Sequence, residues 1–171
     1  MASARVATIV ATARELLEEE GREAVSMRRI AERMGIRAPS LYKHVPDKLE
    51  LEAAIISEGL VEWAIVFEEA LAAGGDPLPT LATAYRCFAR EHPHLYRLMT
   101  EEPLPRARLA PGAEARAAAP VLLASGGDVD LARAVWAFAH GMTILELNDR
   151  FPPDADIDAA WQRGIDAFSS R

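Results

Sequence analysis

Residues 26–48 read SMRRIAERMGIRAPSLYKHVPDK, and this stretch predicts two short helices joined by a sharp turn. Its first residue, a serine, is a favoured N-cap, and apolar residues follow at the i, i+3, i+4 and i+7 spacing of one buried helical face. Gly35 suits the helix exit, and Pro39 suits the first turn of the next helix. Leu41 and Val45 can anchor that very short second helix to the first. The stretch is typical of a helix-turn-helix, whose second helix enters the DNA major groove.

The charge of this stretch differs from that of the whole chain. The 171 residues carry 19 Lys and Arg against 26 Asp and Glu, a formal net charge of −7. Between Arg22 and Lys48, however, seven basic residues stand against three acidic ones. A basic segment on an acidic chain is expected where one face meets phosphates, although a charge run by itself more often only solvates exposed helices. Because the capping, turn and spacing signals coincide with the charge, the DNA-binding interpretation is favoured.

The motifs around this stretch occur together in one known family. A helix ending in EEG is followed by IAERMGI, then LYKHV and DKLEL. With these motifs, the segment from about Val6 to Leu51 resembles the DNA-binding domain of TetR/AcrR-type transcriptional regulators. Arg37 stands where the family more often has a small polar residue, and Val45 where it more often has an aromatic one.

The resemblance implies DNA-binding roles for particular residues. It implies that Ser26 and Arg28 open the first helix of the motif against DNA, and that Lys48 contacts a phosphate. It also places the residues that read the groove on the second helix. The predicted DNA-binding residues are Ser26, Arg28, Arg37, Pro39, Ser40, Tyr42, Lys43, His44 and Lys48.

The rest of the chain predicts an all-α fold of about nine helices in total. Beyond residue 47, periodicity and turn signals predict helices over residues 48–73, 78–92, 93–100, 114–125, 129–149 and 156–168. Residues 101–112 form a loop rich in Pro and Arg, which is expected to be the most mobile segment. We therefore expect a three-helix helix-turn-helix head at residues 1–47, on a larger ligand-binding and dimerisation bundle at residues 48–171.

Two helices near the C-terminus carry more apolar surface than a chain of this size is expected to cover. Between residues 131 and 145 the apolar residues form two stripes, so this helix has to be buried on both sides. The last helix has an apolar face on which Ala160 and Gly164 permit close backbone approach. Pairing both helices with their copies about a two-fold axis would also supply the second reading head that a palindromic operator requires. The predicted dimer interface comprises Ala137, Gly141, Ile144, Ile157, Trp161, Gly164, Ile165 and Phe168.

A second resemblance concerns the bundle. Residues 135–147, VWAFAHGMTILEL, resemble the C-terminal domain of the TetR subgroup marked by a Trp and a His-Gly pair. This resemblance implies a cavity for a small, mainly apolar effector, which polar groups on Tyr85, Tyr96 or His140 could orient. Core packing is the alternative explanation for these aromatic residues. The predicted ligand-binding residues are Trp63, Phe67, Tyr85, Phe88, Tyr96, Met99, Trp136 and His140.

Metal, catalytic and redox sites are not favoured. His92 and His94 are close in sequence, but no third ligand has metal-like spacing. His140 and Glu146 fall on different helix faces, and no nucleophile accompanies them. The lone Cys87 stands in a helical pattern that is typical of a small buried residue.

Together these patterns predict a homodimeric, ligand-responsive DNA-binding regulator, and most specifically a repressor. One cysteine, no membrane-spanning apolar run and no signal peptide lead us to expect a cytoplasmic protein. We expect no metal, no cofactor and no enzymatic activity. Two alternatives stay open: a ligand-binding or interaction module of the same fold without DNA binding, and a helical-bundle enzyme that uses His140.

Overall fold

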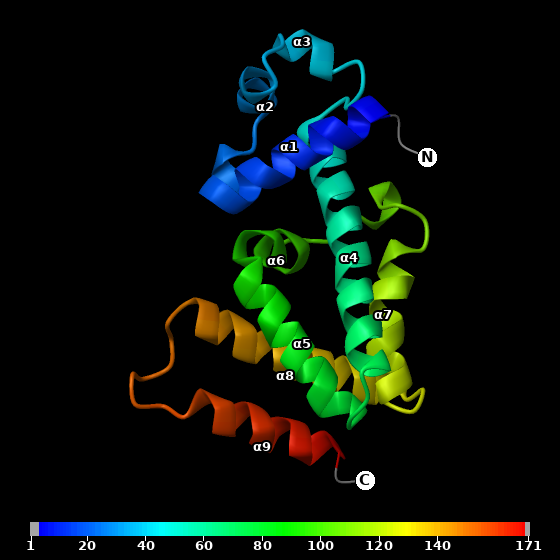
Figure 1. The fold of residues 1–171 in the computed structure, drawn as a ribbon, viewed down its shortest axis with the longest axis vertical. Coiled ribbons are helices and arrows are strands. Elements are labelled where there is room, and N and C mark those ends of the chain that lie inside the picture. The colour runs from blue at the N-terminus through cyan, green and yellow to red at the C-terminus, as the bar shows by residue number, and fades with distance from the viewer. Residues whose placement is uncertain (1–3, 170–171) are drawn as a thin grey trace. The chain divides into compact units, whose positions relative to one another are not determined.

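The structure is a computed structural model that describes residues 4–169, and within that range it contains helices and no strands (Figure 1). Its α-helices are α1 (Ala4–Glu20), α2 (Met27–Arg33), α3 (Ala38–Leu41), α4 (Lys48–Ala72), α5 (Pro77–Glu91), α6 (Pro93–Thr100), α7 (Ala113–Ala124), α8 (Val129–Leu147) and α9 (Ile157–Ser169). Two short 3-10 helices are η1 (Arg22–Ala24) and η2 (Arg106–Arg108). The all-α prediction is confirmed, and the six helices predicted after residue 47 agree with these bounds to within two residues.

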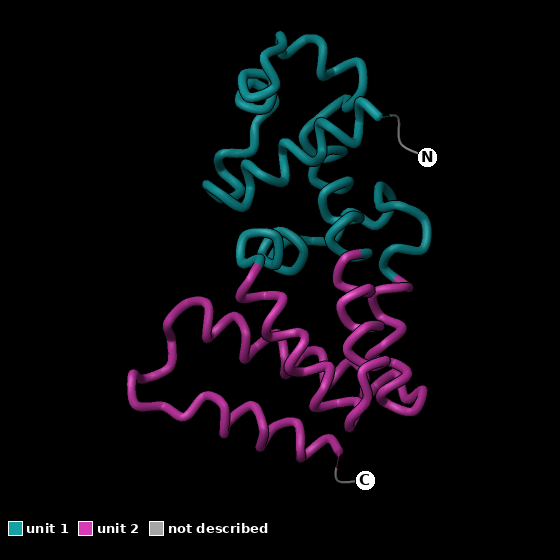
Figure 2. Tube along the Cα trace, viewed as in Figure 1, with its two compact units in different colours: residues 1–61, 92–114 teal, residues 62–91, 115–171 magenta. Residues whose placement is uncertain are grey.

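The chain folds into two compact units (Figure 2). Unit 1 comprises residues 1–61 and 92–114, and unit 2 comprises residues 62–91 and 115–171. Two of the three boundaries fall inside α4 and α7, and the third falls between α5 and α6. This division differs from the predicted domains, 1–47 and 48–171, which remain a prediction. None of the described helices is both long and apolar enough to cross a membrane.

In unit 1, α1 packs against α2, η1 and α6, and α2 packs against α3. The buried stripe of α1 includes Ile9, Val10 and Leu17, at the spacing of one helical face. Ile30 of α2 and Leu41 of α3 are fully buried as well. Burial of these apolar faces holds the short helices in place, because helices of four and seven residues are not stable alone.

In unit 2, α5, α8 and α9 pack against one another. A core cluster joins the three helices through Leu78, Val135 and Ile165. Asp128 caps α8 by accepting hydrogen bonds from the backbone N–H groups of Asp130 and Leu131, both at 3.0 Å.

The apolar face of α9 packs within its own chain, and its predicted place in the dimer interface stays a prediction. Trp161 and Ile165 are 6% and 2% exposed in the single chain. The Phe138 ring of α8 lies so close to Gly164 that a Cβ atom there would collide with it. Phe138 also contacts Trp161 and Phe168, with ring centroids 5.6 and 5.8 Å apart. The periodicity showed that this face is buried, but the covering surface is α8 of the same chain.

Candidate functional site

The helix-turn-helix has the local geometry that the sequence predicts. Ser26 has an extended backbone, and its hydroxyl accepts a hydrogen bond from the Arg29 backbone N–H at 3.3 Å. Gly35 has a φ of +65°, which turns the chain sharply after α2. Pro39 lies in the first turn of α3, where its missing N–H leaves no hydrogen bond unmade. Each of the three signals therefore has the structural role that was inferred from it.

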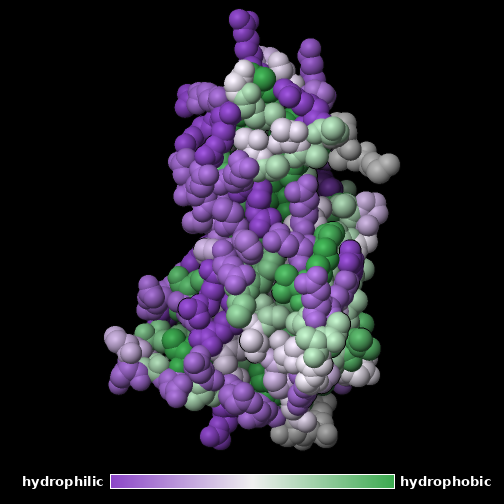
Figure 3. Space-filling model, in the orientation of Figure 1, coloured by the Kyte–Doolittle hydropathy of each residue, from purple (hydrophilic) through white to green (hydrophobic). Residues whose placement is uncertain are grey.

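The second helix is held by its two apolar anchors. Leu41 and Val45 are 0% and 3% exposed, and the backbone N–H of Val45 donates to the Leu41 carbonyl at 2.9 Å. With these positions buried, the residues between them turn outward, and Tyr42 is 52% exposed. Of the nine predicted DNA-binding residues, Ser26 is half-buried and the other eight are exposed. On the face drawn in Figure 3, hydrophilic residues predominate over this end of unit 1.

Several of the basic residues in this segment are held by carboxylates of unit 1. The Arg29 guanidinium lies 2.7 Å from the Glu20 carboxylate, and Arg33 lies 2.5 Å from Glu19. The hydrogen bond from Arg29 holds the pKa of Glu20 below its usual value. The acidic end of α1 thus neutralises part of the basic charge counted from the sequence. The three consecutive glutamates at residues 18–20 were the sequence feature that could have indicated these ion pairs.

Arg28 and Lys48 are held more loosely. Arg28 lies 3.6 Å from Glu32 with its side chain 82% exposed, and Lys48 lies 3.6 Å from Glu52. Arg37 and Lys43 are exposed and form no ion pair with any other residue between 4 and 169. The cations best placed to meet phosphate are therefore Arg37 directly before α3, Lys43 on the turn after it, Lys48 at the start of α4 and Arg28 on the outer side of α2.

Four of the eight predicted ligand-binding residues lie together, in unit 2. The Trp63 ring of α4 has its centroid 4.9 Å from that of Tyr85 and 5.3 Å from that of Phe88, both on α5. Phe67 completes the group, 5.4 Å from Trp63. All four are buried, which is the arrangement that core packing also predicts.

The other four predicted ligand-binding residues belong to α6 and α8. Tyr96 and Met99 belong to unit 1, where both are buried and Met99 packs against Gly59. Trp136 is 52% exposed on α8 and contacts His140, with ring centroids 6.3 Å apart. Within the single chain, Trp136 is thus a surface residue and does not line an enclosed cavity.

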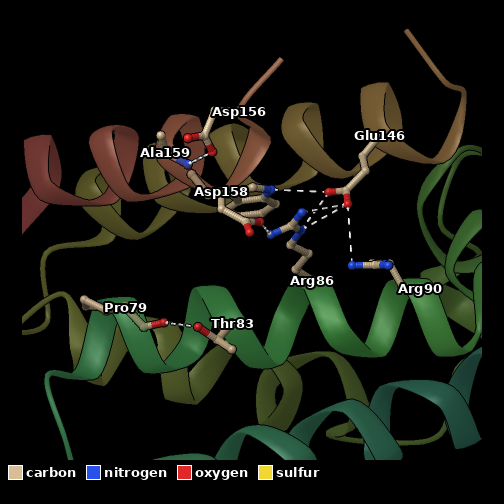
Figure 4. A network of polar contacts seen from close by, with 9 residues as sticks. Pro79, Thr83, Arg86, Arg90, Glu146, Asp156, Asp158 and Ala159 are labelled. Carbon is tan, nitrogen blue, oxygen red and sulfur yellow. Dashed lines mark hydrogen bonds and ion pairs between the residues drawn. The ribbon is translucent and has the colours of Figure 1, made fainter. Parts of the chain in front are cut away.

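Unit 2 also contains a polar network that the sequence did not reveal (Figure 4). Arg86 of α5 donates to both carboxylate oxygens of Glu146 on α8, at 2.8 to 3.1 Å, and to Asp158 on α9. The Trp161 indole N–H donates to Glu146 at 3.4 Å, and Arg90 lies 3.8 Å from the same carboxylate. The hydrogen bond to Glu146, followed by that to Asp158, raises the pKa of Arg86. The network joins three helices, and Arg86 is 60 and 72 positions away from its two carboxylate partners, so no local pattern marks it.

The remaining candidates are the histidines around α6 and the lone cysteine. His92 Nδ1 lies 3.4 Å from Glu18, and the His94 ring packs against Gly21. Among residues 4–169, no three His, Cys, Asp or Glu side chains are grouped so that they could hold a metal ion. Cys87 is exposed, so its expected burial is wrong: the apolar face of α5 turns Tyr85 and Phe88 inward and leaves Cys87 outside.

An all-helical chain with an exposed, capped helix-turn-helix and a second helical unit has the architecture of a DNA-binding transcriptional regulator. Two family models match this chain: "Bacterial regulatory proteins, tetR family" over residues 9–55, and "Tetracyclin repressor-like, C-terminal domain" over residues 78–168. The chain belongs to the TetR family of transcriptional regulators.

Similar proteins agree with this assignment. The uncharacterised HTH-type transcriptional regulator Rv0681 of Mycobacterium tuberculosis is 30% identical over 165 residues, which cover 90% of this chain and 75% of that protein. A protein of unknown function from Rhodococcus sp. RHA1 has the same fold, with a TM-score of 0.78, 22% identity and coverage of 97% and 93% of the two chains. A variant of TetR from Acinetobacter baumannii, solved in complex with minocycline, has a TM-score of 0.67, 24% identity and coverage of 96% and 93%.

Proposed function

We propose that this regulator is a homodimeric repressor that binds a two-fold symmetric operator and releases it when a small effector binds. The observation that carries the proposal is the exposed Tyr42, which stands beside Lys43 and His44 between two buried anchors. An exposed aromatic ring followed by two basic or polar side chains can contact base edges and phosphates at once. Membership in a family of bacterial regulators supports the same role.

The proposal divides the contacts between bases and phosphates. Pro39, Ser40, Tyr42, Lys43 and His44 would enter the major groove, because they lie on or directly after the short helix of the motif. A second set would hold the backbone and set the position of the groove-reading residues. This phosphate-contacting set comprises Ser26, Arg28, Arg37 and Lys48.

A second copy of the chain would cover the outer face of α8. Val129, Trp136 and Leu145 are 48%, 52% and 42% exposed, an unusual amount of large apolar surface for one helix. Ala137 is exposed, and nothing in the described chain lies within 4 Å of a Cβ position at Gly141. This proposal keeps Ala137, Gly141 and Ile144 from the predicted interface and replaces the buried face of α9 with Trp136 and Leu145. A two-fold pairing of this face would present two heads to two half-sites.

Effector binding is proposed for unit 2. The aromatic group of Trp63, Phe67, Tyr85 and Phe88 supplies apolar contact area. The Thr143 hydroxyl on α8 is 1% exposed and has no hydrogen-bond partner among residues 4–169, so a ligand could satisfy it. The minocycline complex of the A. baumannii protein supports a small organic ligand as the class of effector.

The effector would act by favouring one position of α4, which carries Lys48 at its first residue. Half-sites one turn of B-DNA apart are separated by about 34 to 36 Å. A change of a few ångströms in the separation of the two heads would therefore prevent both from binding at once.

Operator selection tests the proposal. The wild-type protein is used to select fragments of genomic DNA from the source organism, and a short duplex carrying the selected sequence is titrated with variants. We expect Tyr42→Ala to weaken binding by roughly 1 to 3 kcal/mol and to relax sequence preference. Lys48→Ala should weaken binding to all sequences and lower the salt slope by about one.

Arg116→Ala is the control, since Arg116 is an exposed arginine of α7, outside the proposed DNA-binding set and outside the proposed dimer face of α8. If both head variants bind the duplex as tightly as wild type, the DNA-binding surface is wrongly assigned. If wild type selects no DNA at all, the protein is better described as a ligand-binding module of the same fold.

A further inference from the structure

The segment between α6 and α7 is held by contacts with other parts of unit 1, although the sequence predicted it as the most mobile part of the chain. Near its start, the Glu102 carboxylate lies 3.2 Å from Arg22 of η1. Near its end, the backbone N–H of Ala110 donates to the Ser57 hydroxyl of α4 at 2.9 Å. Between these two points lies η2, whose two arginines each form an ion pair with a carboxylate of unit 1. We refer to residues 101–112 as the strap.

The central contact of the strap is made by Arg108. One guanidinium nitrogen, Nη1, lies 3.0 and 3.1 Å from the two carboxylate oxygens of Asp47. The same nitrogen lies 3.6 Å from Glu50. Arg108 is thus shared between two carboxylates at the start of α4.

Asp47 in turn holds the start of α4. Its Oδ1 accepts a hydrogen bond from the Glu50 backbone N–H at 2.7 Å, so the side chain caps the helix. This hydrogen bond, and after it the one from Arg108, keeps the pKa of Asp47 below its usual value. The next residue is Lys48, and His44 lies three residues before the cap. A displacement of Asp47 would therefore shift the turn that carries His44 on one side and Lys48, the first residue of α4, on the other.

We propose that Arg108 is a positioning residue for operator binding, which keeps the Asp47 cap and the first turn of α4 in the geometry that presents Lys48 to phosphate. The inference rests on the proposed DNA-binding function. Two carboxylates beside a phosphate-contacting lysine would repel DNA if they were uncompensated, and Arg108 supplies the compensating charge. It does so without occupying the DNA-facing residues of α3, because the charge comes from the strap.

The chain contains a matched control in the same 3-10 helix. Arg106 lies two residues before Arg108, and its guanidinium bonds the Glu114 carboxylate at 2.9 Å. Replacing Arg106 therefore removes one positive charge and one ion pair from η2 without touching the start of α4.

The first experiment compares Arg108→Met, Arg108→Lys and Arg106→Met in the full-length protein, using the duplex that wild type selects from genomic DNA. We expect Arg108→Met to weaken binding roughly tenfold, the loss expected for one charge-assisted contact. Arg108→Lys should restore affinity to within about twofold, because an ammonium group can still bridge Asp47 and Glu50. Arg106→Met should bind like wild type.

The salt dependence separates positioning from direct contact. Because Arg108 is proposed to touch no phosphate, Arg108→Met should keep the wild-type salt slope, whereas Lys48→Ala should lower it by about one. A slope lowered by one in Arg108→Met would show that Arg108 binds DNA itself, which would overturn the inference. Equal affinity of Arg108→Met and wild type would overturn it too.

Hydrogen exchange measured without DNA keeps the inference testable apart from the proposed function. Backbone amides of residues 50–52 should exchange faster in Arg108→Met than in wild type or Arg106→Met, because the cap of α4 is loosened. Unchanged exchange there would refute the positioning role whatever the DNA result. If wild type binds no DNA, the proposed function fails, whereas binding that is insensitive to Arg108 rejects only this inference.

Discussion

The helix-turn-helix and the pair α8–α9 differ in how much their local sequence decides. In the helix-turn-helix, capping and turn residues have local structural roles, and the outward-facing residues are exposed as predicted. In α9 the apolar stripe is buried as predicted and is covered by its own chain, whereas the apolar residues of α8 that were predicted to be buried include the exposed Ala137 and Leu145. A periodic pattern therefore identifies a helix face that avoids water, but it does not show which other helix covers that face.

The two regions also use ion pairs differently. Arg33 of α2 is 36% exposed and its partner Glu19 is 53% exposed, so water screens the pair. Arg86 and Glu146 in unit 2 are only 19% and 14% exposed, and each has further polar partners. The first pair adjusts the charge of a surface, whereas the second joins helices in a core. Four experiments test this contrast.

The largest effect is expected at the outer face of α8. Trp136→Glu would place a charge in the proposed interface once per subunit and should weaken the dimer by about 4 kcal/mol, roughly a thousandfold in dissociation constant. Sedimentation measures the change, and circular dichroism should show unaltered helix content because Trp136 is 52% exposed in the single chain. Thr83→Glu, on the exposed side of α5, is the control. Wild-type protein that remains monomeric at micromolar concentration would remove the basis for the proposed dimer.

The next effect concerns the two kinds of ion pair. Arg86→Met leaves the Glu146 carboxylate without its main partner and should destabilise the protein by about 2 to 3 kcal/mol. Arg33→Met should cost less than about 0.5 kcal/mol, because its pair with Glu19 is screened. Thermal unfolding of the two variants gives the comparison. Equal losses of stability would contradict the distinction between the surface pair and the core pair.

A smaller effect separates the faces of α8 and α9 through two glycines. Gly164→Ala should destabilise the subunit by about 1 to 2 kcal/mol, since the new Cβ meets the Phe138 ring. Gly141→Ala should stabilise the isolated subunit by about 0.5 to 1 kcal/mol, because alanine favours the helix and the described chain leaves space there. Denaturant unfolding under conditions that dissociate the proposed dimer measures both. Matching shifts of the same sign would mean that Gly164 is not closely packed.

The smallest effect is a pH dependence. The hydrogen bond from Arg86 holds the pKa of Asp158 below its ordinary value of 3.8. The contribution of this pair to stability is therefore present above the unfolded pKa and is lost as pH falls through the lower folded pKa. Titration of the carboxyl by NMR should show the depressed pKa in wild type and a value nearer 3.8 in Arg86→Met. An unchanged pKa in that variant would mean that another group causes the shift.

Much of this protein follows from short stretches of its sequence. The motif of residues 26–48 could be read because caps, glycine turns and proline positions act over three to four residues. The order and bounds of the later helices could be read as well, since helical periodicity and breakers are equally local. The same patterns indicated the family, through motifs that stand close together in the chain.

Other features depended on contacts between distant residues. The pairing of Arg33 with Glu19, the Arg86 network and the contact of Arg108 with Asp47 join positions 14, 60 and 61 residues apart. The charge of a side chain does not determine which carboxylate will form an ion pair with a given guanidinium. The covering of the α9 face by Phe138 is of the same kind, because burial depends on which helices meet. Local patterns thus set the helices and most of their buried faces, whereas contacts between distant residues set the partner of each face and each charge.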